Sequence, residues 1–195
     1  MLEDNVLKVG SKTDAKKLAG AITHALKEQG GRAAMRAIGP AAVNQAIKGF
    51  AISREYVAPT GNDLICVLGF EDVEVEGEKR TAIKFGIEPH DRRISKEDIP
   101  IEDILKVSGH ADEAAAGYSK KMAGAIAHAL DESEDGKAVL QAIGAAAVSN
   151  TIKAICIARG YKASQGHDII CVPGFTDIEI DGEKRTAIRF YVEYR

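Results

Sequence analysis

The sequence predicts an α/β fold, specifically an α+β fold of two layers, that is repeated twice along the chain as β-α-β-α-β-β. The first observation behind this prediction is an internal duplication. Tyr56–Phe85 and Tyr161–Phe190 are identical at 19 of 30 positions at a constant offset of 105, including the run GEKRTAI. The second is that apolar residues recur at helical spacing in two segments of each repeat and alternate with polar residues elsewhere. A repeat of about 85 residues is too long for a solenoid unit and has the size of a small domain.

The elements of the first repeat begin with a short apolar strand at Val6–Val9. A helix is predicted over residues 14–28, because Leu18, Ile22 and Leu26 form one apolar face at four-residue spacing. A pair of glycines ends this helix. In the second repeat an alanine-rich insertion precedes the matching helix, and we expect it to lie in the loop.

The second half of the repeat starts with a strand at residues 33–38. A glycine then leads into a helix that begins at Pro40, since helices tolerate proline in their first turn. Val43, Ile47 and Phe50 predict its core face, while small apolar residues cover much of its other side. We therefore expect this helix to pack on two sides, against the sheet and against a neighbour, with the other repeat as one candidate.

A hairpin closes each repeat. In the first repeat residues 63–76 and 78–88 are its strands, and a glycine at the turn follows an acidic residue, which is typical of tight hairpins. Gly69 and Gly174 within the apolar runs predict a bulge or bend. Pro173 predicts a position without a ladder partner in the second repeat.

The domain organisation follows from the duplication. We expect the first repeat at residues 1–88, an extended polar linker at residues 89–103 and the second repeat at residues 104–195. Residues 6–88 carry 12 Lys and Arg against 10 Asp and Glu, a net charge of +2, and residues 104–193 carry 10 against 12, a net charge of −2. Neither repeat has the strong basic excess of many nucleic-acid-binding domains.

The composition is typical of a soluble globular chain, with 45% hydrophobic and 28% charged residues in 195. No apolar run approaches the roughly 18 residues of a membrane span, and the acidic start lacks the pattern of a signal peptide. We expect a cytoplasmic protein without a membrane partner. Cys66, Cys156 and Cys171 lie in apolar stretches without a CxxC pattern, which favours buried thiols over disulfides or a metal site.

Several of these segments together resemble the stage V sporulation protein S family. They are LKV near the start, AGA in the first helix, AIG before the second helix and the block DxICVxxFxDIxIDGExRTAI. The resemblance covers almost all of both repeats. It implies a fold similar to Alba, a chromatin-associated nucleic-acid-binding domain with a four-stranded sheet and two helices on one face. Alba-like domains pair through the second helix and its strand, so the tandem form implies an intramolecular pseudo-dimer of the two repeats.

The resemblance also implies nucleic-acid contacts from a lysine-bearing loop after the first strand and from the hairpin. Together with basic residues on the second helix, the candidates are Lys12, Lys16, Lys17, Lys48, Lys79, Arg80, Lys84, Lys120, Lys121, Lys153, Lys184, Arg185 and Arg189. Lysines beside free amides at a helix start would bind phosphate. The second repeat has no match for Lys12 and offers His110 nearby. Acidic residues crowd the hairpin and favour a hairpin that neutralises itself.

The pattern of residues predicts no enzyme, cofactor or metal site. No metalloprotease, nucleophile-elbow or dinucleotide motif is present, and the stretch Gly10–Thr13 lacks the earlier glycine of a phosphate loop. His24 and His128 are expected on the surface. Few aromatic residues and no tryptophan argue against base stacking and leave binding to the DNA or RNA backbone with low sequence specificity. The alternative is a protein-protein interaction and assembly module in bacterial development or regulation, with further self-association open.

Overall fold

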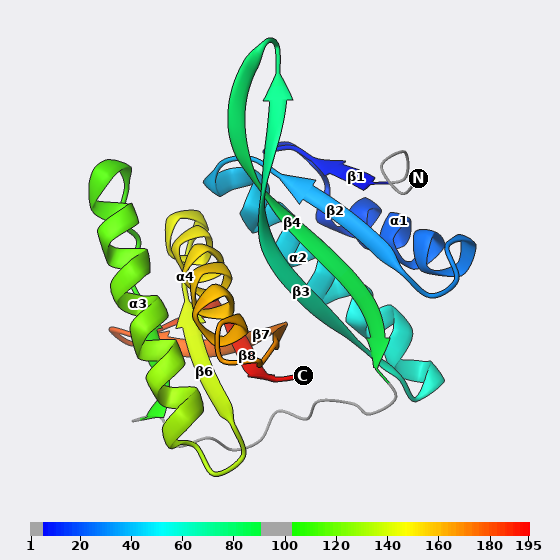
Figure 1. Cartoon of the computed structure of the whole chain (residues 1–195). Coiled ribbons are helices and arrows are strands. Elements are labelled where there is room, and N and C mark those ends of the chain that lie inside the picture. The colour runs from blue at the N-terminus through cyan, green and yellow to red at the C-terminus, as the bar shows by residue number, and fades with distance from the viewer. Residues whose placement is uncertain (1–5, 91–102) are drawn as a thin grey trace. The chain divides into compact units, whose positions relative to one another are not determined.

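The computed structural model describes residues 6–90 and 103–195. By their contacts the chain splits into two compact units, one before and one after residue 95. Each unit contains four strands and two α-helices in the predicted order (Figure 1). The α+β two-layer fold is therefore confirmed in both repeats.

In the first unit a four-stranded sheet carries both helices on one face. The elements are β1 (Val6–Val9), α1 (Ala15–Glu28), β2 (Ala33–Ala37), α2 (Pro40–Val57), the 3-10 turn η1 (Ala58–Thr60), β3 (Asp63–Val75) and β4 (Glu78–His90). The strand order is β1-β2-β4-β3, with β1 parallel to β2 and the other pairs antiparallel. Both helices lie behind these strands in Figure 1. The face of the sheet away from the helices is called the outer face below.

The second unit repeats this arrangement. Its elements are β5 (Leu105–Val107), α3 (Asp112–Glu132), β6 (Lys137–Ala142), α4 (Ala145–Ala163), β7 (Ile169–Ile180) and β8 (Glu183–Tyr194). The strand order is β5-β6-β8-β7, with the same parallel and antiparallel pairs. The sheet and the helices again form two layers, with a buried apolar core between them.

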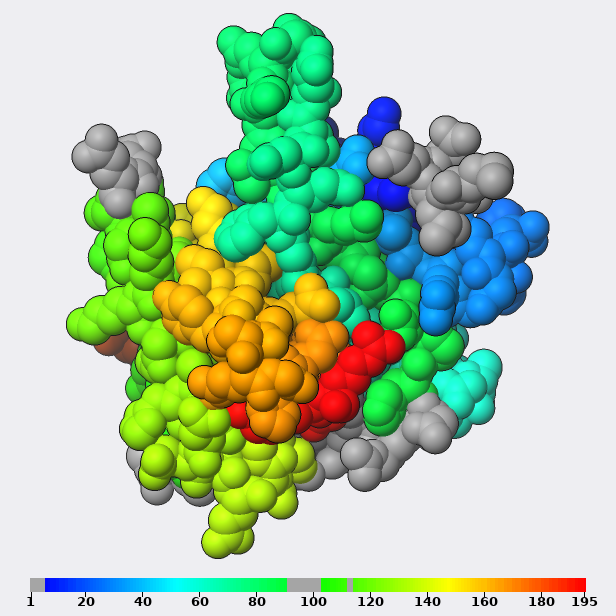
Figure 2. Space-filling view, viewed as in Figure 1, coloured from blue at the N-terminus to red at the C-terminus, as the bar shows by residue number. Residues whose placement is uncertain are grey.

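The hairpin of each unit extends beyond its sheet as a two-stranded arm. β2 pairs with β4 only from Ile83 to Ile87, so within the unit residues 71–82 pair only with one another. We call them the first arm, which projects from the molecular surface (Figure 2). Residues 176–187 form the second arm in the same way, because β6 pairs with β8 only from Ile188 onward. Both arms turn through two residues of positive φ, as tight hairpins require.

Of the bulge or bend predicted at Gly69 and Gly174, no bulge is formed. The pairing register runs without interruption through both residues, with Gly69 opposite Lys84 and Gly174 opposite Arg189. Pro173 is also in register, opposite Phe190, because a proline removes only the hydrogen bond of its own nitrogen. Each of the two glycines lies opposite a long basic side chain.

The alanine-rich insertion of the second unit is helix and not loop. α3 begins at Asp112 and spans 21 residues, compared with 14 in α1, because alanine has the highest helix propensity. The extension fixes the loop before it. Tyr118 Oη accepts a hydrogen bond from the Ser108 N–H at 2.8 Å, and Asn150 Nδ2 donates to the carbonyls of Ser108 and His110 at 3.2 Å each.

The expected linker begins later than residue 89. β4 continues through Pro89 and His90, which lie opposite Leu64 and Asp63 of β3. Pro89 lies beyond Ile87, the last residue of β4 that pairs with β2, so on that side its missing N–H breaks no ladder bond. Residues 91–102 of the predicted linker lie outside the described residues.

A buried lysine connects the helix ends of the second unit. Lys162 is 1% exposed, and its Nζ donates to Asp131 Oδ1 at 2.5 Å and to Gln165 Oε1 at 3.2 Å. Tyr194 Oη donates to the same Asp131 oxygen at 2.9 Å. The hydrogen bond between Lys162 and Asp131 holds the pKa of Asp131 below its ordinary value. The same hydrogen bond raises the pKa of Lys162. Lys162 is therefore a structural cation and not a surface charge.

α1 and α2 approach closely at Gly49, which has no side chain between them. A Cβ at Gly49 would lie 2.6 Å from Leu18 Cδ2 and 2.8 Å from Leu18 Cγ. The matching positions of the second unit are the buried Ala154 and Met122. Unbranched methionine adapts its shape where leucine cannot, so the two units solve the same contact with different residue pairs.

We predict that Gly49→Ala destabilises the first unit by about 1–2 kcal/mol, because overpacking outweighs the better helix propensity of alanine. Adding Leu18→Met should restore much of the loss by reproducing the pair of the second unit. Gly20→Ala is the matched control, since Gly20 is an exposed α1 residue whose added Cβ meets nothing within 4 Å. Urea and thermal unfolding would measure these changes. A Gly49→Ala variant as stable as Gly20→Ala would contradict the close helix contact.

Candidate nucleic-acid interface

Three predicted lysines come together around the start of α1. The preceding loop is a closed turn, in which the Thr13 N–H donates to the Gly10 carbonyl at 3.1 Å and the Gly10 N–H donates to Thr13 Oγ1 at 2.9 Å. Lys12 lies within this turn and Lys16 and Lys17 in the first turn of α1. All three are exposed. We call them the α1 lysines.

The positive charge of this end comes from the lysines rather than from free amides. Asp14 caps α1, and its side chain accepts the Lys17 N–H at 2.8 Å, which uses one of the amides that an anion would need. Residues 10–17 contain three lysines and one aspartate, a net charge of +2. The helix dipole adds a partial positive charge at the same place. The arrangement can bind phosphates by flexible point charges.

The second unit does not reproduce this cluster. Lys120 and Lys121 are exposed, but they lie in the middle of α3, about two turns after its start, because the insertion extends the helix. The prediction that they lie beside open helix amides is wrong for this reason. His110 packs against Tyr118 with the rings tilted and their centroids 4.2 Å apart, in the loop that the Asn150 side chain holds by hydrogen bonds.

Lys48 and Lys153 are half-buried residues in the interiors of α2 and α4. Within the described residues neither lysine forms a hydrogen bond or an ion pair. Gly39 and Gly144 precede the two helices with a φ of 83° each, a conformation that favours glycine. The glycines thus have a conformational reason to be there.

The arms place basic residues among more numerous acids. The first arm carries five Asp and Glu against two Lys and Arg, a net charge of −3, and the second arm carries four against two, a net charge of −2. Arg80 pairs with Glu78 at 2.7 Å, and Arg185 pairs with Glu183 at 3.0 Å. Lys79 and Lys184 each lie opposite a glutamate in the pairing register. The arms are therefore poor ligands for phosphate.

Lys84 belongs to a cross-strand row of basic residues that the sequence did not reveal. Lys8, Arg36 and Lys84 are register partners on β1, β2 and β4, on the outer face. We call them the first row. Glu71 bridges two of them, with Oε2 2.5 Å from Arg36 Nε and Oε1 3.3 Å from Lys84 Nζ. Hydrogen bonding from Arg36, and then from Lys84, holds the pKa of Glu71 below its ordinary value despite partial burial.

The second unit has a matching row with a different charge balance. Lys106, Gln141 and Arg189 are register partners, and we call them the second row. Arg189 Nε donates to Gln141 Oε1 at 3.3 Å. Thr176 stands where the first unit has Glu71. In the sequence, the alternation of apolar and basic residues around Lys8 and Arg36 indicates that these basic side chains point away from the core. It does not indicate that they lie side by side, because that depends on strand pairings that one sequence does not specify.

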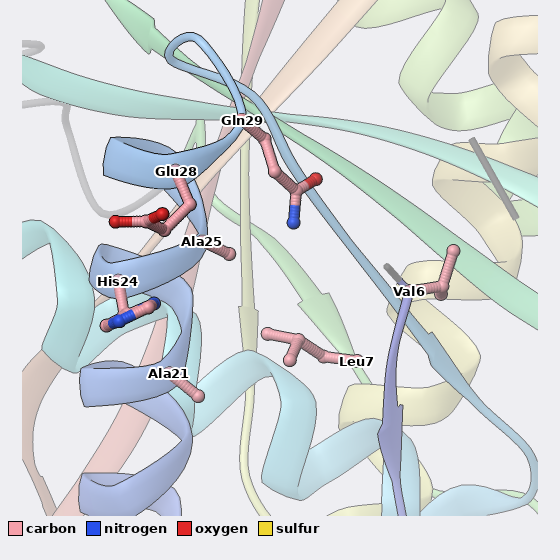
Figure 3. A pocket seen from close by; sticks show the side chains of 7 residues that line it. All are labelled: Val6, Leu7, Ala21, His24, Ala25, Glu28 and Gln29. Carbon is pink, nitrogen blue, oxygen red and sulfur yellow. The ribbon is translucent and has the colours of Figure 1, made fainter. Parts of the chain in front are cut away.

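A hollow of about 480 Å³ lies between α1 and β1 (Figure 3). It is lined by Val6, Leu7, Ala21, His24, Ala25, Glu28 and Gln29. His24 is exposed there, as predicted, on the α1 side of the hollow. The lining contains a glutamate and no lysine or arginine, so it does not extend the cluster of α1 lysines.

The cysteines lie in the core of the two units. Cys66, Cys156 and Cys171 are buried, as predicted, and burial raises the pKa of Cys156 to about 12. Among residues 6–90 and 103–195, no group of three His, Cys, Asp or Glu side chains could hold a metal ion. None of the helices described there combines the length and apolar character needed to cross a membrane.

Comparison with known families gives one match that occurs twice. A family model described as Stage V sporulation protein S matches residues 5–90 and again residues 103–195. The two matches coincide with the two structural units and together include most of the chain.

We predict that Glu71→Gln destabilises the first unit by about 1 kcal/mol at neutral pH, because it removes the carboxylate shared by Arg36 and Lys84. The folded-state pKa of Glu71 is lowered. The stability that the Glu71 carboxylate contributes is therefore complete above its unfolded-state pKa and is lost as the pH falls through its folded-state pKa. Urea unfolding from pH 7 downward should show the difference disappearing in acid. Glu74→Gln, at an exposed position of the first arm, is the control, and an equal effect there would argue against the bridge.

Proposed function

Because the chain belongs to the stage V sporulation protein S family in two tandem copies, we propose that it is a cytoplasmic, non-enzymatic, sporulation-related protein that binds DNA or RNA. In this proposal the two units act as an intramolecular pseudo-dimer, and binding is directed at the phosphate backbone. Low sequence specificity follows from that mode, since phosphate contacts position a protein without identifying bases.

The cluster of α1 lysines is the observation that carries this proposal. Lys12, Lys16 and Lys17 are exposed, lie within six residues of one another and share one helix start. The one acid among residues 10–17, Asp14, is engaged as the helix cap. Each lysine that neutralises a phosphate releases a condensed counterion, which drives binding and makes it sensitive to salt.

The proposed site belongs to the first unit. The second unit has its two matching lysines in the middle of α3 and a histidine packed against a tyrosine in the preceding loop. The first repeat also carries the positive net charge of +2. We therefore assign phosphate binding mainly to the first unit and expect the second unit to support it as the partner domain.

Backbone binding is favoured over base stacking. Aromatic residues make up 5% of the chain, and no tryptophan is present. Among the described aromatic residues the markedly exposed ones are Phe70, Tyr56 and Tyr161, which lie on an arm base and at two helix ends. A row of stacking platforms, as single-strand binders use, is not formed by these three.

Protein assembly is the second candidate function. The acidic arms favour it, because a surface with a net charge of −3 or −2 repels phosphate but can contact a basic protein surface. Such an assembly would use the arms, whereas nucleic-acid binding would use the α1 lysines.

We predict that replacing Lys12, Lys16 and Lys17 together by glutamate abolishes binding to a short DNA duplex at low salt. In the wild type, a plot of the logarithm of the binding constant against the logarithm of the salt concentration should have a negative slope. About 2 to 3 units of that slope should come from the counterions that this cluster releases. Fluorescence anisotropy with labelled DNA and RNA, repeated at rising salt, would measure both. Lys120→Glu with Lys121→Glu is the matched control and should retain most of the binding. Equal losses in the two variants would contradict a site at the α1 lysines.

We predict that the protein remains a single chain in solution, with the mass of 20.8 kDa expected for a pseudo-dimer. Light scattering over a range of protein concentrations would measure this. A mass that rises with concentration would contradict a self-contained pseudo-dimer and support the assembly module.

A further inference from the structure

The outer face of the second unit contains a cavity of about 610 Å³. This volume lies within the range of small-molecule sites. The cavity is bounded by β5, the end of β6 and the second arm. Its lining is Ile104, Lys106, Val107, Ser108, Gly109, Gln141, Ile143, Asp177, Ile178, Glu179, Ile180 and Arg189. All three members of the second row are included, so basic and apolar side chains share one enclosure.

The two cations of this cavity lack the carboxylate that the first row has. Within the described residues, Arg189 makes one hydrogen bond, to Gln141 Oε1, and no ion pair, while Lys106 makes neither. In the first unit Glu71 pairs with both Arg36 and Lys84. Thr176 replaces that glutamate in the second unit. The positive charge of the second row is therefore left for another anion.

The two acidic residues of the lining, Asp177 and Glu179, lie on the face of the second arm opposite to that of Arg189. Arg189 lies opposite Gly174, so strand alternation places Thr176, Ile178 and Ile180 on its face of β7. Asp177 and Glu179 alternate with them, and Asp177 Oδ1 accepts a hydrogen bond from Thr186 Oγ1 at 3.4 Å. These two carboxylates form part of the rim and would oppose a ligand of high negative charge.

The apolar part of the lining is incompletely covered. Ile143 is 39% exposed and Ile180 is 37% exposed, which makes them two of the few large apolar side chains on the described surface. A ligand with an apolar body would remove them from water, at a gain of roughly 25 cal/mol per Å² of apolar surface. The chemistry of the cavity is thus cationic on one side and apolar on the other.

We propose that this cavity binds a small organic anion, namely a carboxylate attached to an apolar body. The carboxylate would bind Arg189 and Lys106. Gln141 would donate through Nε2, because its Oε1 already accepts from Arg189. The apolar body would lie against Ile143, Ile178 and Ile180. The site is separate from the α1 lysines and does not depend on nucleic-acid binding.

The test uses the full chain and 2-naphthoate as the probe, with neutral 2-naphthamide and inorganic phosphate as comparators. Titrations followed by NMR should shift the signals of Arg189 Nε–Hε and of Ile178 and Ile180. The naphthamide should bind at least about tenfold more weakly, a difference of about 1.4 kcal/mol, because it lacks the charge. Equal binding of the two, or tighter binding of phosphate than of naphthoate, would overturn the carboxylate assignment.

Thr176→Glu is the decisive variant, because it supplies the carboxylate that the first unit has. It should weaken binding of naphthoate at least about tenfold, whereas the uncharged Thr176→Gln should retain it. Circular dichroism of both variants would establish that they fold. Unchanged affinity in a folded Thr176→Glu protein would overturn the proposal.

The first unit offers the converse experiment. Glu71→Thr should remove the carboxylate beside Lys84 and create a second site for naphthoate near the first row, with new shifts at the first-row side chains. Naphthoate binding that leaves the first-row signals of the variant unchanged would contradict the role assigned to the glutamate-to-threonine difference. Binding of DNA should remain as in the wild type when Thr176 is changed, which keeps this test independent of the α1 lysines.

Discussion

The unbroken register of the long hairpin is the constraint on which each unit depends. β4 lies between β2 and β3, and β8 lies between β6 and β7, so these strands determine which residues face one another across the sheet. Because side chains alternate between faces, the same register places apolar residues toward the helices and the basic rows on the outer face. It also aligns Gly69 with Lys84 and Gly174 with Arg189. The core and both rows are consequences of one alignment.

The two copies use this common frame in different ways. In the first, Glu71 holds Arg36 and Lys84 in ion pairs on the outer face, and the exposed α1 lysines gather at the start of α1. In the second, α3 is longer, its loop is held by hydrogen bonds and the positive charge of the second row faces a cavity. Two exchanges, of Glu71 for Thr176 and of Arg36 for Gln141, separate a row in which two cations share a carboxylate from a row whose two cations have none.

The sequence predicted the order of the elements and most of their boundaries because the signals are local. The four-residue spacing around Ile22 and the glycines at helix starts identify segments without reference to the rest of the chain. The first row was missed because Lys8, Arg36 and Lys84 meet only through strand pairings between distant segments. The alanine-rich insertion forms the start of α3 and not the predicted loop, because the helix propensity of alanine extends the helix. The candidate lysines at α1 were found because they are neighbours in the chain.

The two-residue turn of each arm, at Glu76 and Gly77 in the first unit, limits how this chain can vary in length. Adding one residue to a single strand of the arm would shift the following side chains of β4 to the opposite face and turn Lys84 toward the helix layer. Balanced additions to both strands would lengthen the arm and leave the sheet as it is. Variation in length within such a hairpin should therefore occur as matched pairs of residues near the tip, one in each strand. The number of residues between the two partners of the row, such as Gly69 and Lys84, then stays even.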